Sequence, residues 1–177
     1  MFANNVSNSL SQSYMFTALR KFLLLLVDVP VLQSQQNKVA LPTGNFITMT
    51  SLGEDVKSTN RISYANEAGD PGSEIQQRTA FWRVQLDCFG SEAQSLASLI
   101  STAFRSEWAC MAFKSLSDSI APISGGDPRQ TAFINSESEY EDRWTLEATL
   151  GIDKAVTLPQ YFFTQDDVET YSYEMSQ

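Results

Sequence analysis

Apolar residues in the N-terminal part of the chain recur at the spacing of a helix. One face, with the i, i+3, i+4, i+7 pattern, is formed by Leu19, Phe22, Leu23 and Leu26. We expect this helix to begin near Ser11 or Ser13, since either side chain could cap it, and to end before Pro30. Leu24 and Leu25 make its second half apolar on nearly every side. The pattern predicts a helix covered on more than one side, by its own sheet or by a neighbouring subunit.

Strict alternation of apolar and polar residues predicts two strands later in the chain. In residues 79–88 the apolar face consists of Ala80, Trp82, Val84, Leu86 and Cys88. In residues 143–150 it consists of Trp144, Leu146, Ala148 and Leu150. Strands of this kind place one face on a core and leave the other face wet or at an interface, which is typical of antiparallel sheets.

Shorter signals predict a second helix and two further strands. Residues 31–35 and 46–52 are expected as strands on either side of a Pro-Thr-Gly turn. Ser91 and Gln94 have the spacing of a capping box at the start of a helix. The apolar stripe of that helix consists of Ala93, Leu96, Leu99, Ile100, Ala103 and Phe104.

The remaining segments are mostly polar connections. Residues 53–74 contain a short strand signal near residues 61–64, and we interpret this connection as a hairpin arm. Residues 120–129 are predicted as a loop, because two prolines and a Gly-Gly pair interrupt them. A short strand, an acidic turn and a last extended piece follow at residues 131–135, 137–139 and 156–163.

This order of elements predicts an α+β fold, with an antiparallel β-sheet and helices packed on one face. At 177 residues the chain fits one domain, residues 1–177, and is long enough to bury a sizeable core. Within it we expect a loose N-terminus over residues 1–10 and a polar, acidic C-terminal arm over residues 164–177.

Composition narrows the possible functions. The 21 acidic and 12 basic residues give a formal charge of −9, which argues against a protein that grips nucleic-acid phosphates. The absence of histidine excludes the Ser-His-Asp triad, the Cys-His dyad and the HExxH zinc site. Cys88 and Cys110 lie far apart without a C-x-x-C element, so we expect two reduced, mostly buried thiols. We predict no catalytic residue, cofactor or metal site.

The one strongly apolar run, FLLLLV at residues 22–27, is much shorter than the ~20 residues needed to cross a bilayer. The charged residues that bracket it also do not fit a signal peptide. We therefore expect a soluble protein that is intracellular where it is made and has no membrane partner.

Several residues are candidates for contacts between subunits, Leu24 and Leu25 among them. Gln36 and Asn37 could satisfy strand ends at a subunit seam or could be a solvated strand terminus. Four charged residues could form cross-strand ion pairs on the outer face of the sheet or be ordinary surface charges: Arg83, Asp87, Arg143 and Glu147. In the acidic C-terminal arm, two aromatic residues could contact a neighbour or belong to a solvated terminus: Tyr171 and Tyr173.

Four segments of the sequence contain short motifs that follow one another along the chain. They are QSQQNKVALPTGNFITMT (residues 33–50), VQLDCFGSEA (84–93), YEDRWTLEATL (140–150) and VTLPQYF (156–162). The first contains a Gln-Asn pair, a proline and a Phe-hydrophobic-x-Met-Thr strand. With these segments the chain resembles the tail-terminator (neck) proteins of long-tailed bacteriophages. None of the four segments is catalytic.

The resemblance implies a structural virion protein with a tail-terminator-like α+β fold. It implies a hexameric ring that caps the completed tail tube, ends tube polymerisation and offers a docking surface to the head connector. The implied partners are further copies of the chain, the tail tube protein, the sheath where one exists, and head–tail connector proteins. DNA would pass through the lumen without specific binding. The alternatives are another ring of the neck or tail, such as a tail completion or head–tail joining subunit, and, more distantly, a ligand-binding domain or a carboxylate-only enzyme.

Overall fold

The computed structural model describes residues 6–36, 40–65, 72–131, 133–134 and 140–160. The helices in these residues are α1 (Gln12–Leu26), α2 (Ala93–Ala103) and α3 (Glu107–Leu116). The first strands are β1 (Ser7–Asn8), β2 (Val31–Gln33), β3 (Phe46–Val56), β4 (Arg61–Ala65) and β5 (Ser73–Phe89). The later strands are β6 (Ile120–Gly125), β7 (Arg129–Gln130), β8 (Phe133–Ile134), β9 (Tyr140–Glu141) and β10 (Arg143–Pro159). The predicted acidic turn at residues 137–139 lies outside the described residues.

The sheet is built on one long antiparallel pair, β5 and β10. These strands stay in register over 17 residues each, from Arg143 opposite Phe89 to Pro159 opposite Ser73. β3 and β4 pair with the other edge of β5, while β7, β6 and β1 pair with the other edge of β10. The two strands predicted from alternation are therefore confirmed, and both are longer than the alternation indicates.

β2 differs from the predicted antiparallel arrangement, because it pairs parallel to β3. The segment between these strands returns the chain to the end from which β2 began. A parallel pair needs such a return of about a dozen residues, whereas an antiparallel pair needs only a tight turn. The α+β prediction is confirmed, with a mixed and mostly antiparallel sheet.

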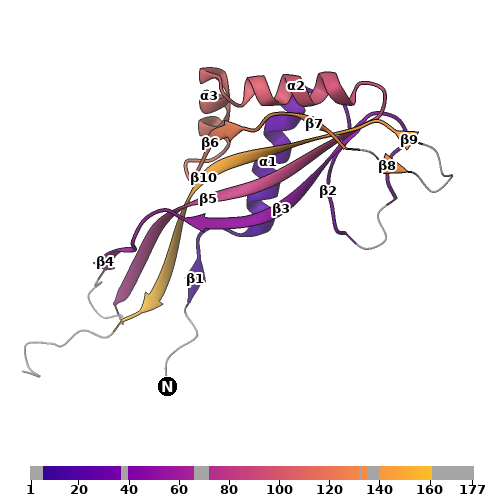
Figure 1. Cartoon of the computed structure of the whole chain (residues 1–177). Coiled ribbons are helices and arrows are strands. Elements are labelled where there is room, and N and C mark those ends of the chain that lie inside the picture. The colour runs from indigo at the N-terminus through magenta and orange to yellow at the C-terminus, as the bar shows by residue number, and fades with distance from the viewer. Residues whose placement is uncertain (1–5, 37–39, 66–71, 132, 135–139, 161–177) are drawn as a thin grey trace, which may run out of the picture.

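The helices cover one face of the sheet (Figure 1), and the core lies between them and the strands. The predicted inward residues of both alternating strands are buried, apart from the partly buried Trp144 at the start of β10. The Trp82 ring meets Phe16 of α1 edge-on, with centroids 5.1 Å apart, and its Nε1 donates to Ser51 Oγ at 2.9 Å. Phe22 of α1 stacks on Phe113 of α3 at 4.4 Å. Aromatic packing thus joins the helices to each other and to the sheet.

The predicted helix starts have different outcomes. Ser11 caps α1 as expected, since its Oγ accepts a hydrogen bond from the Tyr14 amide at 3.2 Å. The capping box predicted at Ser91 is wrong, because α2 begins at Ala93 and has no side-chain cap of its own. Asn45, far away in the sequence, accepts instead from the Glu92 amide at 3.2 Å through Oδ1. Gly90, with φ of +95°, permits this approach, because a Cβ there would overlap the Asn45 side chain.

The loop predicted at residues 120–129 is wrong for residues 120–125 and 129, because β6 and β7 pair there with β10, and it holds for residues 126–128. These strands satisfy backbone groups that the edge of β10 would otherwise leave open. Gly125 of β6 passes close under α2, where an added Cβ would lie 3.0 Å from Phe104 Cβ. α3 is a helix that the sequence reading missed, since of its residues only Ala109 and Phe113 are buried.

The N-terminus is more ordered than expected. Residues 7–8 form β1 on β10, with Ser7 opposite Thr157, and Leu10 is buried in the core. The prediction of a loose N-terminus is therefore wrong for residues 7–10, because the free edge of β10 and the core give them partners. No helix in the described part of the chain is long and apolar enough to cross a membrane.

Beyond the helices the sheet continues as an arm, which we define as β4 with residues 73–78 of β5 and residues 154–159 of β10. Figure 1 shows the arm extending away from α2 and α3. Every residue of this arm is half-buried or exposed. The hairpin arm expected in residues 53–74 is thereby confirmed for its described strands, β4 and β5, while residues 66–71 lie outside the described residues.

Candidate assembly surfaces

Asp87 is the most buried charged residue on the outer face of the sheet, with 3% of its surface exposed. Its carboxylate accepts from Arg143 Nη2 at 3.0 Å, from Thr145 Oγ1 at 2.6 Å and from Gln85 Nε2 at 2.9 Å. Thr145 lies directly opposite it in the β5–β10 register. The predicted cross-strand ion pair between Asp87 and Arg143 is present, and this carboxylate is fully engaged within its own subunit.

Arg83 forms a looser pairing further along the same face. It lies 3.2 Å from Asp55 Oδ2 of β3 and 3.7 Å from Glu147 Oε1 of β10. The side chains of all three residues are close to half exposed. The Arg83–Glu147 pair is the second of the predicted cross-strand pairs. Exposed pairs of this kind contribute about 0–1 kcal/mol each, so they leave the charges open to other partners.

A hollow of about 300 Å³ lies beside Asp87, between the segment after β2 and the outer face of β3 and β5. Gln36, Leu41 and Arg143 all contribute to its lining. Gln36 is exposed and donates to Gln33 Oε1 at 3.4 Å. The structure therefore places Gln36 next to Asp87 and Arg143, an arrangement that their separation in the sequence does not reveal.

Exposed apolar side chains gather on the helix side of the molecule. Leu25 of α1 is 59% exposed and follows the buried Phe22 by three positions, on the same face of the helix. The Trp108 ring of α3 lies 5.8 Å from the Phe22 ring and is 45% exposed. Met111, one turn further along α3, is 66% exposed. We call Leu25, Trp108 and Met111 the helix patch; Leu24 is also exposed on α1.

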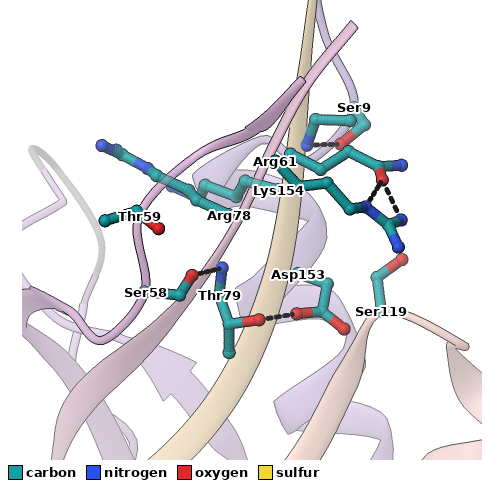
Figure 2. Close-up of a pocket in the computed structure, with 11 residues that line it drawn as sticks. Ser9, Ser58, Thr59, Arg61, Arg78, Thr79, Ser119, Asp153 and Lys154 are labelled. Carbon is teal, nitrogen blue, oxygen red and sulfur yellow. Dashed lines mark hydrogen bonds between the residues drawn. The ribbon is translucent and has the colours of Figure 1, made fainter. Parts of the chain in front are cut away.

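A cavity of about 610 Å³ lies where the arm meets the rest of the sheet (Figure 2). Its cationic lining side chains are Arg61 of β4, Arg78 of β5 and Lys154 of β10. Among the described residues, Asp153 is the only carboxylate in the lining, and it accepts from Thr79 Oγ1 at 2.6 Å. We call this the basic cavity. The sequence does not predict the basic cavity, because its three cationic residues come from three different strands.

The two thiols differ in their surroundings. Cys88 is buried and free, and burial, with a smaller contribution from the Asp87 charge, raises its pKa to about 12. Cys110 is free but exposed on α3, so the prediction of buried thiols is wrong for this residue. The α3 face that carries Cys110 is turned away from the core. The part of the chain that the structure describes contains no cluster of three or more potential metal-ligating residues.

The predicted contact residues separate into three groups. On or beside the outer face of the sheet lie Gln36, Arg83, Asp87, Arg143 and Glu147. On the helix side lie Leu24 and Leu25. Outside the described residues lie Asn37, Tyr171 and Tyr173. The sequence reading missed Met111, although its i, i+3 spacing from Trp108 is a helical signal.

Comparison with known families gives one finding over most of the chain. The model of a family described as phage neck terminator protein matches residues 13–175. The match begins inside α1 and includes α2, α3 and the whole β5–β10 pair. No curated protein matches the chain.

Proposed function

The chain belongs to the phage neck terminator protein family, and on this premise we propose that it forms a ring that caps the completed tail tube. The family is structural and not enzymatic, and membership implies partners in the tail tube and the neck. In our proposal the ring ends tube polymerisation and offers its other side to the head connector. Six copies, the number implied by the resemblance noted above, would surround a lumen through which DNA passes.

The arm is the observation that carries this proposal. β5 and β10 continue past the helices for several residues, and among the described elements none buries either face of this part. A sheet extension with open faces and a free β4 edge gains little stability on its own. It is, however, well suited to contact another molecule through backbone and side-chain groups. We infer that the arm is a contact element between neighbouring subunits or with the tail tube.

A closed ring also needs a second, different surface on each subunit, because its interface is formed head to tail. The helix patch supports this requirement, since it exposes three large apolar side chains on packed helices. Its residues belong to α1 and α3, and Figure 1 shows the arm extending away from α3. Aromatic residues and methionine are enriched at the centres of interfaces. We propose that the helix patch, with Leu24, lies at the seam of the ring.

The outer face of the sheet offers a third surface, with the hollow beside Asp87 and the open charges of Arg83 and Glu147. Gln36 at this hollow retains the contact role proposed for the Gln-Asn pair. Because Asp87 is saturated internally, we assign it a role in holding this face in shape. Its neighbours Gln36 and Arg83 are the residues we expect to reach a partner.

A tube-capping assay tests the proposal. Leu25→Lys places a charge in the helix patch, and lysine is chosen because a cation is tolerated at a helix C-terminus. We expect this variant to melt like the wild type, because Leu25 is 59% exposed, yet to lose its ring and its ability to stop tube growth. Leu99→Lys, at an exposed leucine of α2, is the matched control and should cap tubes normally. If both variants cap tubes, the helix patch does not lie at the seam of the ring. If the wild-type protein does not limit tube length, the proposed function is wrong.

A further inference from the structure

Two of the three cationic side chains in the basic cavity have no acidic partner among the residues that the structure describes. Lys154 lies 2.6 Å from Glu54 Oε1 and is neutralised by it. Arg61 donates through Nε to the neutral Gln77 Oε1 at 3.1 Å. The side chain of Arg78 makes no hydrogen bond or ion pair with any residue that the structure describes, while its backbone lies opposite Lys154 in the sheet. Two guanidinium groups therefore line the cavity without a carboxylate partner in the described part of the chain, whose full sequence has a formal charge of −9.

The cavity is held in shape by hydrogen bonds among its own small polar side chains, as the dashed lines in Figure 2 show. Ser58 Oγ accepts from the Thr79 amide at 3.0 Å, and Thr79 Oγ1 donates to Asp153 at 2.6 Å. Ser9 Oγ accepts from the Ala155 amide at 2.8 Å on the other edge of β10. These bonds tie the loop after β3 and the segment after β1 to the central strands. The cationic side chains thus project from a fixed frame.

The same chain contains a segment of complementary charge. Residues 161–177 include four acids and no lysine or arginine: Asp166, Asp167, Glu169 and Glu174. Tyr171 and Tyr173 lie between the last two of these acids. Guanidinium groups bind carboxylates in a bidentate manner and stack on aromatic rings. An acidic segment with tyrosines is therefore the kind of partner that Arg61 and Arg78 would recognise.

The direction of β10 favours a cavity on another copy over the cavity of the same copy. The cavity is lined by residues 153–155 of β10, and the strand then runs to the arm tip, where the Gln160 amide donates to the Gly72 carbonyl at 2.7 Å. The chain is heading away from its own cavity where residues 161–177 begin. Those residues can span up to about 56–61 Å when extended, at about 3.3–3.6 Å per residue. A neighbouring subunit in a ring lies within that reach.

We propose that the acidic segment 161–177 of one copy docks in the basic cavity of the neighbouring copy, where Arg61 and Arg78 pair with its carboxylates. This inference rests on the ring proposed above and assigns the receptor for the C-terminal arm. In this arrangement residues 161–177 leave the tip of the β5–β10 arm of one subunit. The basic cavity at the base of the same arm receives residues 161–177 of the next subunit. Docking would then link the subunits in one direction around the ring.

Disulfide trapping between two variants of the full-length protein tests this docking. Both carry Cys110→Ser; one also carries Thr59→Cys in the exposed cavity lining, and the other Ser172→Cys between the two tyrosines. Mixed and gently oxidised, they should give a covalent dimer of the two variants. Ser115→Cys, an exposed position on α3, replaces Thr59→Cys as the control and should give no such dimer. High salt should reduce the yield, because the pairing is electrostatic.

Charge reversal decides whether the arginines are the receptor. Arg61→Glu with Arg78→Glu in the Thr59→Cys protein should abolish the dimer, and Asp166→Lys with Asp167→Lys in the other protein should restore it. Lys114→Glu, at an exposed cation of α3, is the control and should change nothing. The proposal is wrong if the dimer yield matches the Ser115→Cys control, or if charge reversal has no effect. It is also wrong if Thr59→Cys and Ser172→Cys in one chain close an internal disulfide without linking copies.

The mass of the wild-type protein separates this failure from a failure of the ring. A ring of normal mass that gives no specific cross-link contradicts only the docking of residues 161–177. A wild-type protein that stays monomeric and does not cap tubes contradicts the proposed function itself.

Discussion

β5 and β10 pass through two regions that differ in what covers them. Under the helices, alternate residues of both strands are buried against α1, α2 and α3, from Ala80 to Cys88 in β5 and from Leu146 to Ile152 in β10. In the arm the same two strands keep the same register, yet each of their residues is half-buried or exposed. Backbone pairing is therefore common to both regions. We call the part of the sheet under the helices the body. The body differs from the arm because helices cover one of its faces, and the uncovered arm is the part available to other molecules.

Charged groups follow the same division. In the body, Asp87 is surrounded by donors from its own subunit, so its charge is satisfied internally. In the arm, the side chain of Arg78 has no partner among the described residues, and the side chain of Arg61 has only a neutral one. We infer that the buried charge of Asp87 holds the sheet in shape under the helices, while Arg61 and Arg78 of the arm are available for contacts.

The largest difference between the regions should appear on truncation of a large apolar side chain. Trp82→Ala removes a fully buried indole from the body and should lower the free energy of unfolding by about 3–5 kcal/mol. Ile62→Ala on the arm, where the side chain is half exposed, should change it by no more than about 0.5 kcal/mol. Chemical denaturation followed by tryptophan fluorescence and circular dichroism gives both values. Equal losses would mean that the arm is part of the cooperative core.

A smaller but still large effect is expected at the buried carboxylate. Asp87→Ala leaves Arg143 and Thr145 without their acceptor and should cost about 3 kcal/mol, toward the low end for broken buried pairs because Arg143 is partly exposed. Glu147→Ala, in the exposed pair with Arg83, should cost about 0–1 kcal/mol. Thermal melts of the two variants in the same buffer compare them directly. Similar costs would show that the Asp87 network is no more than surface charge.

The buried thiol adds a dependence on pH that the exposed thiol lacks. Burial raises the pKa of Cys88 to about 12, so the folded protein keeps this proton at pH values where an unfolded chain has released it. The contribution of Cys88 to stability is therefore complete below about pH 9 and falls as the pH rises toward 12. Cys88→Ala should remove this part of the alkaline loss when the two melts are compared. At neutral pH a thiol reagent should modify Cys110 at once and Cys88 only after unfolding.

The smallest expected effect concerns the binding of nucleic acid. The basic cavity, at the base of the arm, is the described site that could attract duplex DNA, yet the whole chain carries a formal −9. We expect no measurable binding of random duplex DNA at an ionic strength of about 0.15 M. Filter binding or fluorescence anisotropy measures this, with Arg78→Glu as the matched variant. A tight, salt-sensitive complex that Arg78→Glu abolishes would make the cavity a phosphate site in place of a docking site for residues 161–177.

The sequence predicts the body of the fold better than the arm, for a physical reason. Where one face of a strand is buried, burial imposes a period of two, and Trp82 and Leu146 reveal it. Residues 73–78 have both faces open, so no period marks them and the predicted strand begins at residue 79. β6 was missed because Pro122 and the Gly-Gly pair obscure a strand whose partner, β10, lies far along the chain. The cap of α2 comes from Asn45, which local spacing does not reach.

The candidate surfaces were predictable to the extent that strand register controls them. Alternation places Arg83 and Asp87 on the face opposite the core, and antiparallel pairing brings Arg143 and Glu147 beside them. The burial of Asp87 and the position of Gln36 depend on the fold around β2, which the sequence does not show. The basic cavity depends on three separate strands meeting, so it becomes visible only in three dimensions.

The mass and shape of the purified protein test the central claim most directly. Light scattering with negative-stain imaging should show a closed ring with a mass of about six times 19.7 kDa, seated on the end of tail tubes when these are added. A protein that remains a 19.7 kDa monomer at high concentration, and that leaves tube ends bare, would contradict the ring and the function proposed for it.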